Sequence, residues 1–200
     1  MDVSETKPFV IREGLTAAQR DAAAALFWQA FRRKLHLPMW PRHRALVFLK
    51  MQISPEHAIV ALDRTGQVIG LAGYKTRQGA FVSGGLHDLH KVYGRFGGVW
   101  RGALLSVFER ELEPGVMMMD GICVDASWRG HGIGSALLDA VKIRARGLNC
   151  LRIQLNVVDT NPKARALYLR QGFQVARVED IWPLHWIYGF RRSDVMYCEL

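Results

Sequence analysis

The residues with the clearest chemical meaning lie between positions 129 and 135, where the chain runs RGHGIGS. An apolar stretch of strand length, 117–125, precedes them, and apolar residues recur at helical spacing after them. A helix that opens out of a glycine turn directs several unpaired backbone N–H groups at one point, and its dipole adds partial positive charge there. The order of strand, glycine turn and helix therefore predicts an anion site, most naturally for a phosphate.

The helix after this turn is predicted from a single apolar stripe, with Gly147 placed to end it. The stripe consists of Ile133, Ala136, Leu137, Ala140, Val141 and Ala145.

Three phosphate-binding designs use such turns, and the residue types separate them. A P-loop requires lysine before Ser135, where the chain has Gly134. A dinucleotide fingerprint requires a third glycine at Ser135 and an acidic residue about 20 positions on, where the next predicted strand instead ends at Asn156. The arrangement Arg129-x-x-Gly132-x-Gly134 resembles the acyl-CoA pyrophosphate loop of the GNAT N-acetyltransferase superfamily.

A second motif follows a predicted strand at 151–156. Asn161 is a good helix N-cap, Pro162 suits the first helical position, and Gly172 suits the residue after the helix end. The pattern Asn-x-x-Ala-x-x-Leu-Tyr-x-x-x-Gly-Phe resembles the second GNAT signature, whose tyrosine, here Tyr168, lies beside the CoA sulfur. Both motifs occur in the family's order and spacing.

The resemblance implies an α/β (α+β) GNAT fold, with a mixed central sheet of about six to seven strands flanked by helices. It also implies acetyl-CoA as cosubstrate and direct attack of a primary amine on the thioester. The acceptor is a small molecule or a peptide N-terminus. An acyl-CoA-binding sensor or partner-binding module without turnover is the alternative. The length of 200 residues, with no internal repeat or low-complexity tract, predicts one domain over 1–200, and the cysteines lack metal-binding spacing, so no metal is expected.

The remaining elements are predicted from periodicity and turn residues. Strands are expected at 9–12, 57–62, 67–75, 173–178 and 194–200, and helices at 16–31 and 42–51, with a break at 37–41.

The segment 84–112 departs from the compact family pattern and is predicted to be a helical insertion interrupted at Gly97 and Gly98. Its apolar stripe, which includes Tyr93, Val107 and Phe108, could cover the core, line the acceptor site or form a contact in a homodimer. The aromatic segment 181–190 is either a wall of the acceptor site or a crossover packed on the sheet. Trp40 either touches the acceptor or packs.

The expected chemistry needs groups that hold CoA, deprotonate the amine and stabilise the leaving thiolate. The resemblance places the pantetheine along the edge of 122–124, where two central strands splay apart, with the Val124 amide as an oxyanion donor. The cofactor-binding set is therefore Ile122, Cys123, Val124, Arg129, Gly130, His131, Gly132, Ile133, Gly134, Ser135, Asn156, Asn161 and Tyr168.

Tyr168 is the predicted general acid. A phenol with a pKa near 10 is protonated at neutral pH and can give its proton to a leaving thiolate, whose thiol has a pKa of about 8.5. Its helical stripe with Ala164 and Leu167 also fits plain packing.

The base is less clearly marked in the sequence. The position aligned to the catalytic glutamate of some family members is Asn156, and an amide cannot act as a base at neutral pH. Asp120 is the predicted base, because it alternates with Ile122 and Val124 along the central strand and burial would raise its pKa. An Asp that only bonds backbone is the alternative, and His131 and His185 are weaker candidates.

Composition limits the partners. The net charge of +9 is spread along the chain without a nucleic-acid-binding motif, so nucleic acid is not an expected partner, and CoA phosphates account for part of the excess. The net positive charge also favours anionic small molecules or acidic peptide N-termini as acceptors, whereas scattered acidic residues would suit a polyamine.

The sequence also bears on where the protein is found. No apolar run is long enough to span a membrane, no signal-peptide core is evident, and three cysteines argue against a disulfide framework. The sequence thus predicts a cytoplasmic protein.

Overall fold

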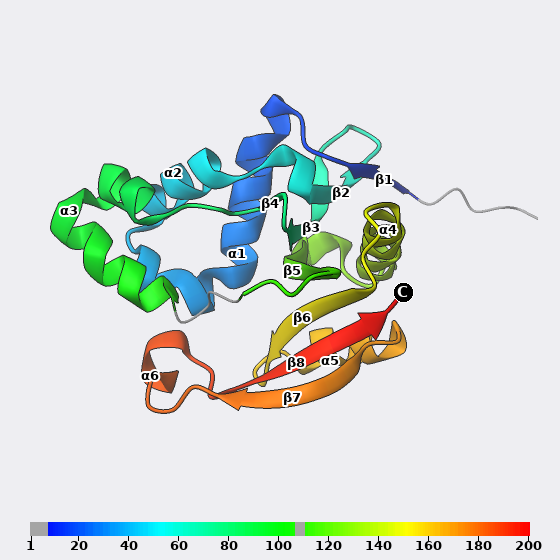
Figure 1. Cartoon of the computed structure of the whole chain (residues 1–200). Helices are drawn as coiled ribbons and strands as arrows, with labels where there is room; N and C mark the ends of the chain where they lie inside the picture. The colour runs from blue at the N-terminus through cyan, green and yellow to red at the C-terminus, as the bar shows by residue number, and fades with distance from the viewer. Residues whose placement is uncertain (1–7, 107–110) are drawn as a thin grey trace, which may run out of the picture.

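The structure is a computed structural model that describes residues 8–106 and 111–200 (Figure 1). In chain order its elements are β1 (Phe9–Glu13), the 3-10 turn η1 (Ala17–Gln19), α1 (Arg20–Met39), α2 (Arg42–Gln52), η2 (Pro55–His57), β2 (Ala58–Asp63), β3 (Val68–Thr76), β4 (Gly79–Ala80), α3 (Leu86–Leu105), β5 (Val116–Val124), η4 (Ala126–Trp128), α4 (Ile133–Gly147), β6 (Arg152–Val158), α5 (Pro162–Arg170), β7 (Gln174–Asp180), α6 (His185–Tyr188) and β8 (Arg192–Glu199).

One mixed sheet runs through the molecule in the order β1-β2-β3-β5-β6-β8-β7, and β4 pairs with the end of β3. The β5–β6 pair is parallel, and the other pairs of that series are antiparallel. The predicted mixed sheet of about six to seven strands is confirmed. The additional strand, β4, has two residues, too few to show a period in the sequence.

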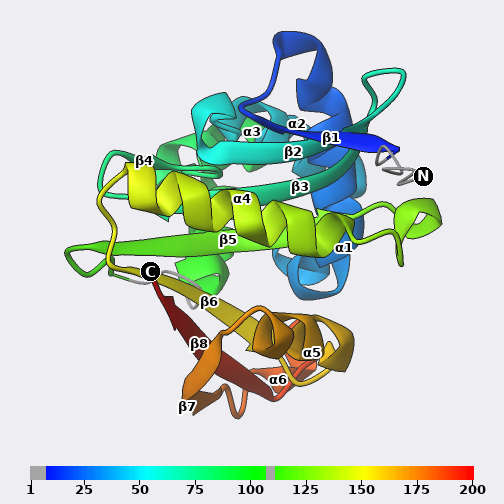
Figure 2. The ribbon, with the colours of Figure 1, turned by 90° about the vertical axis from the view of Figure 1, so that its right-hand side faces the viewer.

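Helices cover both faces of the sheet, with α4 crossing one face and α1 lying behind the other (Figure 2). The stripe predicted for α4 is confirmed, since Ile133, Leu137, Val141 and Ala145 are buried in the core that contains Met117 of β5, and Ala136 and Ala140 are partly buried against it. Leu138, which the stripe did not include, is buried as well. A second core lies on the α1 face and includes Phe27, Phe48, Leu49 and Phe81. This burial of apolar stripes on both faces is the main stabilising term for the sheet.

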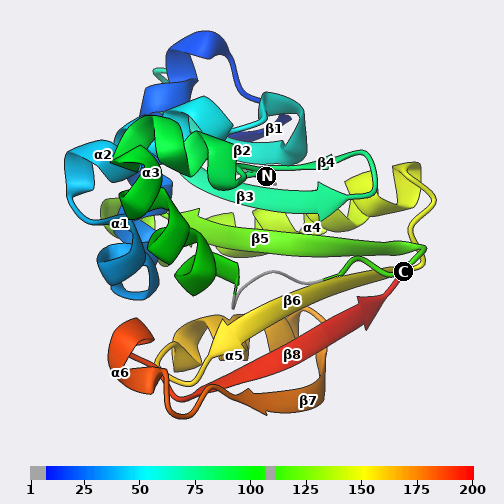
Figure 3. The same cartoon turned by 60° about the vertical axis from the view of Figure 1, so that its left-hand side comes forward.

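The strands β5 and β6 separate part-way along their length. They pair only where Val116–Met118 faces Arg152–Gln154. Beyond that point β5 stays on β3 and β6 stays on β8, and Figure 3 shows the two strands diverging toward α1 and α6. The splay implied by the family resemblance is therefore present, and it leaves one edge of β5 without a neighbouring strand.

A β-bulge lies in β5 at the start of this splay. Gly73 pairs with Gly121 and Tyr74 with Met119, so Asp120 is the extra residue. Such a residue interrupts the alternation of side chains. Asp120 bonds the backbone of Phe81 on the α1 face, whereas Ile122 and Val124 pack on the α4 face. The prediction that Asp120 shares a face with Ile122 and Val124 was wrong for this reason.

Two predicted helix breaks differ from the structure. Helix α1 continues through Pro38 to Met39, and both residues are buried, which offsets the backbone hydrogen bond that proline cannot make. Helix α3 is broken at Gly94 (φ 75°, ψ 168°) rather than at Gly97 and Gly98. Two positions of its predicted stripe, 107 and 108, lie outside the described residues. The last predicted position, Leu112, is not helical, since α3 ends at Leu105.

No helix within 8–106 or 111–200 combines the length and the apolar character that a bilayer span requires.

Candidate functional site

A cavity of about 890 Å³ lies where β5 and β6 separate. Its walls come from both splayed strands, from α1 and α5, and from the aromatic segment 181–190. The lining includes five residues of the predicted site: Asp120, Ile122, Asn156, Asn161 and Tyr168. Side chains from distant parts of the chain therefore meet in one space, although the sequence showed only the local motif around each of them.

Asp120 is the extra residue of the β5 bulge, and its carboxylate lies against the backbone that follows β4. Its Oδ2 accepts hydrogen bonds from the backbone N–H groups of Phe81 (3.1 Å) and Val82 (3.4 Å), just after β4. Burial raises the pKa of Asp120 to about 6, and the two backbone bonds only partly oppose that rise. The predicted rise in pKa is confirmed, and it leaves a carboxylate that can exchange a proton near neutral pH.

Tyr168 lies on α5 with its ring buried against Phe173, the two ring centroids being 5.8 Å apart. Burial raises the pKa of the Tyr168 phenol, and the nearby Cys123 thiol contributes in the same direction. No hydrogen bond to its hydroxyl is formed by the described residues. The phenol is therefore protonated at neutral pH, and its proton remains available to a group in the cavity.

Asn156 and Asn161 differ in their structural roles. The Asn161 side chain accepts a hydrogen bond from the Ala164 N–H at 3.2 Å and caps α5, as predicted. Asn156 is exposed on β6 and pairs with Val195 of β8, so the strand continues past its predicted end to Val158. Its side chain has no structural partner among the described residues, which leaves its amide free to face a ligand.

The glycine turn has the backbone geometry of an anion site. Gly130 (φ 86°) and Gly132 (φ 76°) both adopt the left-handed region, which strongly favours glycine. Gly132 is the N-cap of α4, and no side chain caps the helix there. The first helical N–H groups, from Ile133 to Ser135, precede the first intrahelical donor and remain open to a ligand.

The side chains of this turn fold back onto the protein. The Arg129 Nε donates to the Val124 carbonyl at 3.4 Å, and the His131 ring lies beside Trp128 with its Nδ1 3.2 Å from the Arg129 carbonyl. Both residues are exposed. A side chain at Gly134 would meet Leu167 of α5 at 3.0 Å, so close helix packing is one reason for glycine there.

The open edge of β5 presents alternate backbone groups. Asp125 N–H donates to Ile69 of β3, and alternation in an antiparallel pair turns the N–H and C=O of Val124 and Ile122 to the opposite edge. Cys123 faces β3 by the same rule, so its backbone does not serve that edge. Burial raises the pKa of the Cys123 thiol to about 12, which makes it a poor nucleophile at neutral pH.

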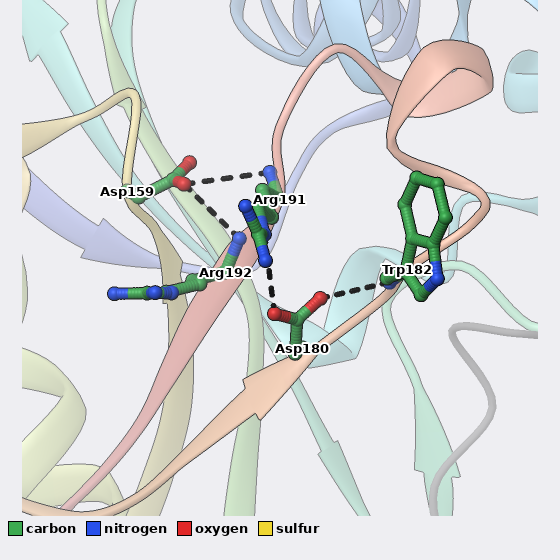
Figure 4. Close-up of polar contacts among 5 residues, drawn as sticks. All are labelled: Asp159, Asp180, Trp182, Arg191 and Arg192. Carbon is green, nitrogen blue, oxygen red and sulfur yellow. Dashed lines mark hydrogen bonds and ion pairs between the residues drawn. The ribbon is translucent and has the colours of Figure 1, made fainter.

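Two carboxylates, Asp159 and Asp180, bond the residues at the two ends of the aromatic segment 181–190, which are called its neck below (Figure 4). Asp159 accepts from the backbone N–H groups of Arg191 (3.4 Å) and Arg192 (3.0 Å). Asp180 accepts from the N–H of Trp182 (2.8 Å) and from the Arg191 Nε (3.3 Å). The Asp159 bonds join the end of β6 to the start of β8, and the Asp180–Arg191 bond joins the end of β7 to the residue before β8. Together they fix where the segment leaves and rejoins the sheet.

Within this segment the aromatic residues divide into two groups. Tyr188 and Phe190 are buried and line the cavity, and the Tyr188 hydroxyl donates to Leu104 of α3 at 2.7 Å. Trp182 and Trp186 are exposed. The segment is thus both a wall of the cavity and a packed crossover, which were the two predicted alternatives.

Several cavity residues were not identified from the sequence, among them Phe31, Ser83 and Thr160. They come from elements whose place in the fold has no local signal. Tyr93 was predicted to shape the acceptor pocket, but it is buried away from the cavity and donates to the Met39 carbonyl at 2.8 Å. Trp40 is exposed and lies beside His36, outside the cavity lining.

Within the described ranges, no group of three or more His, Cys, Asp or Glu side chains could hold a metal ion.

Comparison with known families identifies the class of protein to which this fold and site correspond. The model of the acetyltransferase (GNAT) family matches residues 20–173. The chain therefore belongs to the GNAT family, whose members are acetyl-CoA-dependent acyltransferases.

Individual relatives are more distant. The uncharacterized protein YdhI of Bacillus subtilis (strain 168) is 39% identical over 57 residues, which cover 28% of this chain and 36% of that protein, so the chain spans about a third of this relative's length. A GCN5-related N-acetyltransferase from Kribbella flavida has a TM-score of 0.65 at 20% identity, over 96% of this chain and 98% of that one. A further acetyltransferase structure has a TM-score of 0.62 at 22% identity, over 95% and 98%. These structures share the fold.

Proposed function

We propose that this chain transfers the acetyl group of acetyl-CoA to a primary amine, of a small molecule or a peptide N-terminus, by direct attack within a ternary complex. The observation that supports this best is the cavity at the β5–β6 splay. Asp120, with its raised pKa, and the buried phenol of Tyr168 reach that cavity from different elements. The two groups suit the two proton movements that acetyl transfer requires.

The cofactor would be held by backbone groups at two places. The N–H groups of Ile133 to Ser135, with the dipole of the 15-residue helix α4, suit the pyrophosphate. The open edge at Ile122 and Val124 suits the pantetheine amides, which would pair with it as a strand does. The Val124 N–H then donates to the thioester oxygen as negative charge develops there.

Asp120 acts as the base in this mechanism. An amine with a pKa near that of lysine, about 10.4, is protonated at neutral pH and must lose a proton before it attacks. With a pKa of about 6, the Asp120 carboxylate is mostly ionised at pH 7 and accepts a proton more readily than an ordinary carboxylate does. The ammonium proton is first lost to solvent, and the neutral amine nitrogen then bonds to the thioester carbon. The C–S bond breaks, its electron pair leaves with the sulfur, and the one proton that the new amide nitrogen must lose passes to Asp120.

Tyr168 acts on the leaving group. The departing sulfur carries the electron pair of the broken C–S bond, and the Tyr168 hydroxyl donates a hydrogen bond or a proton to it. Burial raises the pKa of this phenol, which makes full proton transfer to a free thiolate harder. The same apolar surroundings also raise the pKa of the leaving thiol, so the pKa values of the phenol and the thiol shift in the same direction.

The thiol nearest this machinery does not favour a covalent route. Cys123 is buried and its pKa is raised to about 12, so very little thiolate exists at neutral pH to attack the thioester. This supports direct attack without an acetyl-protein intermediate.

A thiol-release screen tests the proposal. Acetyl-CoA is incubated with the protein and one amine of each class, namely amino acids, polyamines, aryl amines and peptides, and the product is identified by mass spectrometry. We expect amine-dependent thiol release, an N-acetyl product and no acetylated protein intermediate. Tight acetyl-CoA binding by calorimetry without thiol release from any amine would instead favour the sensor function.

A further inference from the structure

A second cavity, of about 440 Å³, lies between α1 and the aromatic segment, beside the main cavity. Arg33 and Gly189 line both cavities, so the two adjoin. The other lining residues are Arg32, His36 and Leu37 from α1, with Trp186 and Ile187 from α6. An acceptor bound in the main cavity can therefore extend into this outer one.

The outer cavity carries uncompensated positive charge. Its described lining contains the basic side chains of Arg32, Arg33 and His36 and no carboxylate. Within 8–106 and 111–200, neither Arg32 nor Arg33 forms a hydrogen bond or an ion pair, whereas Arg165 and Arg191 bond Asp194 and Asp180. Both guanidinium groups line this one cavity, so an anion bound there is attracted by each of them.

Trp186 adds an apolar surface to this cavity. Its side chain is 83% exposed, and its ring lies against His185, with the centroids 4.6 Å apart. His185 in turn stacks on the ring of Trp182 at 5.2 Å. Contiguous exposed apolar surface marks interaction sites, whereas single exposed residues do not, so this row of rings beside two guanidinium groups indicates a ligand surface.

The main cavity has carboxylates of its own. Asp120, Glu111 and Glu179 line it beside the basic Arg33, Lys34 and Lys75, and Glu179 also pairs with Arg177. Asp120 is the carboxylate that the proposed mechanism uses as the base, so the amine end of an acceptor would lie beside it. Outward from Asp120, the described lining of the second cavity has the basic groups of α1 and no carboxylate. A ligand that matches both has an amine at one end and a negative charge at the other.

We propose that the amine acceptor carries an anionic group, a carboxylate or a phosphate, which Arg32 and Arg33 bind in the outer cavity while Trp186 covers the atoms between the two ends. This inference rests on the proposed acetyltransferase function and assigns the acceptor class. Guanidinium groups bind carboxylates and phosphates through paired hydrogen bonds, which gives both affinity and orientation. A plain polyamine is disfavoured, because its second ammonium would lie beside two arginines.

The test uses matched acceptors that differ only in charge. The probes are ω-amino carboxylates of increasing chain length with their carboxamides, and Gly-Asp-Asp with its fully amidated Gly-Asn-Asn counterpart. We expect the acetyl-transfer KM to be about tenfold lower for the anionic member of a pair, the size of one charge-assisted hydrogen bond. The pair that shows the larger difference tells whether the acceptor is a small molecule or a peptide.

Arginine variants locate the effect. Arg33→Gln or Arg32→Gln should raise the KM of the anionic probe about tenfold, leave that of its amide within about twofold, and leave the acetyl-CoA KM unchanged. The control is Arg64→Gln in the β2–β3 turn. Arg64 is exposed and lines neither cavity, so this variant removes the same charge away from both sites. Equal KM values within each pair, or equal effects of Arg33→Gln and Arg64→Gln, would overturn the inference while acetyl transfer stands.

A binding measurement separates this inference from the proposed function. In protein labelled with 5-fluorotryptophan, the ¹⁹F resonance of Trp186, assigned with Trp186→Phe, should shift when the carboxylate probe is added and not when its amide is added. Arg33→Gln should abolish that shift. If no probe releases thiol, the proposed function fails, and the titration still decides: a charge-selective shift supports the anion site, and its absence overturns it.

Discussion

The negative charge of Asp120 is unfavourable in the folded protein, because its carboxylate is buried. Two backbone N–H groups and the charges of Lys75 and Lys34 only partly offset that burial. The native protein therefore binds this proton up to a higher pH than the unfolded chain does. Wild-type stability from this group is consequently greatest below about pH 4 and falls as the pH rises through 6. The rise of the pKa from 3.8 to about 6 corresponds to about 3 kcal/mol at pH 7.

Asp120→Asn should therefore gain stability relative to the wild type as the pH rises. We expect the difference in unfolding free energy between the two to change by up to about 3 kcal/mol between pH 4 and pH 7, in favour of the variant, because Asn keeps the acceptor oxygen without the charge. Urea denaturation at the two pH values measures this.

Asp125→Asn is the matched control for that experiment. Hydrogen bonds from Ser127 lower the pKa of Asp125, so its contribution to stability is present above the ordinary pKa and lost as the pH falls. The Asp125 variant should thus show the opposite trend with pH. Parallel trends in the two variants would show that burial of the Asp120 charge has been misassigned.

Tyr168→Phe should separate packing from chemistry. The substitution keeps the ring against Phe173, and since no described residue bonds the hydroxyl, its loss leaves no unpaired partner behind. We expect thermal stability and acetyl-CoA affinity to stay close to wild type, while kcat falls about 10²- to 10⁴-fold, the usual worth of acid–base catalysis. A kcat within a few-fold of the parent would remove Tyr168 from the mechanism.

At the scale of elements, the N-terminus of α4 can be tested without disturbing the glycines. Gly134 packs on Leu167, so a bulky residue there would change helix packing as well as ligand access. Ser135→Asp instead places a negative charge in the first turn, where it stabilises the helix by about 0.3–1 kcal/mol yet repels a phosphate. We expect unchanged or higher stability with about tenfold weaker CoA binding by calorimetry, and near-normal binding for the neutral control Ser135→Asn.

The neck of the aromatic segment gives a second prediction at this scale. Asp159→Ala removes the acceptor for two backbone N–H groups and loosens the start of β8 (Figure 4). Because the segment forms a wall of the cavity, the acceptor KM should rise several-fold while the acetyl-CoA KM stays constant. A change in both constants would mean that the neck supports the whole site rather than the acceptor wall.

The elements that sequence could predict are those with local signals. The Asn161 cap, the turn at Gly132 and the stripe of α4 each depend on residues within a few positions, and the structure has all three. The bulge at Asp120 could not be predicted, because it depends on the register against β3. The continuation of α1 through Pro38 depends on burial by other elements and was missed for the same reason.

At the scale of the whole molecule, charge and cavity must be considered together. The chain carries a net charge of +9, while acetyl-CoA is strongly anionic. The attraction should raise the encounter rate, so kcat/KM for acetyl-CoA should fall as ionic strength rises from about 0.05 M to about 0.5 M, with kcat nearly constant. A flat salt dependence of kcat/KM would show that the positive charge does not act on the cofactor.

The site as a whole could be predicted only in part. The two motifs identified Tyr168, Asn156, Asn161 and the phosphate turn, and all but the turn line one cavity in the structure. The acceptor side was not predictable, because Arg33 on α1 and Trp186 on α6 are brought together by tertiary packing. Such contacts leave no spacing in the sequence.

The most direct test of the mechanism is the pH dependence of acetyl transfer to an acceptor found in the thiol-release screen. If Asp120 takes the amine proton, kcat for the wild type should decline on the acidic side with an apparent pKa near 6, the value that burial gives this carboxyl. Asp120→Asn should turn over at least about 10²-fold more slowly and lack that limb, while Asp125→Asn should keep both the rate and the limb. An unchanged acidic limb in Asp120→Asn would contradict the account, because another group would then be the base.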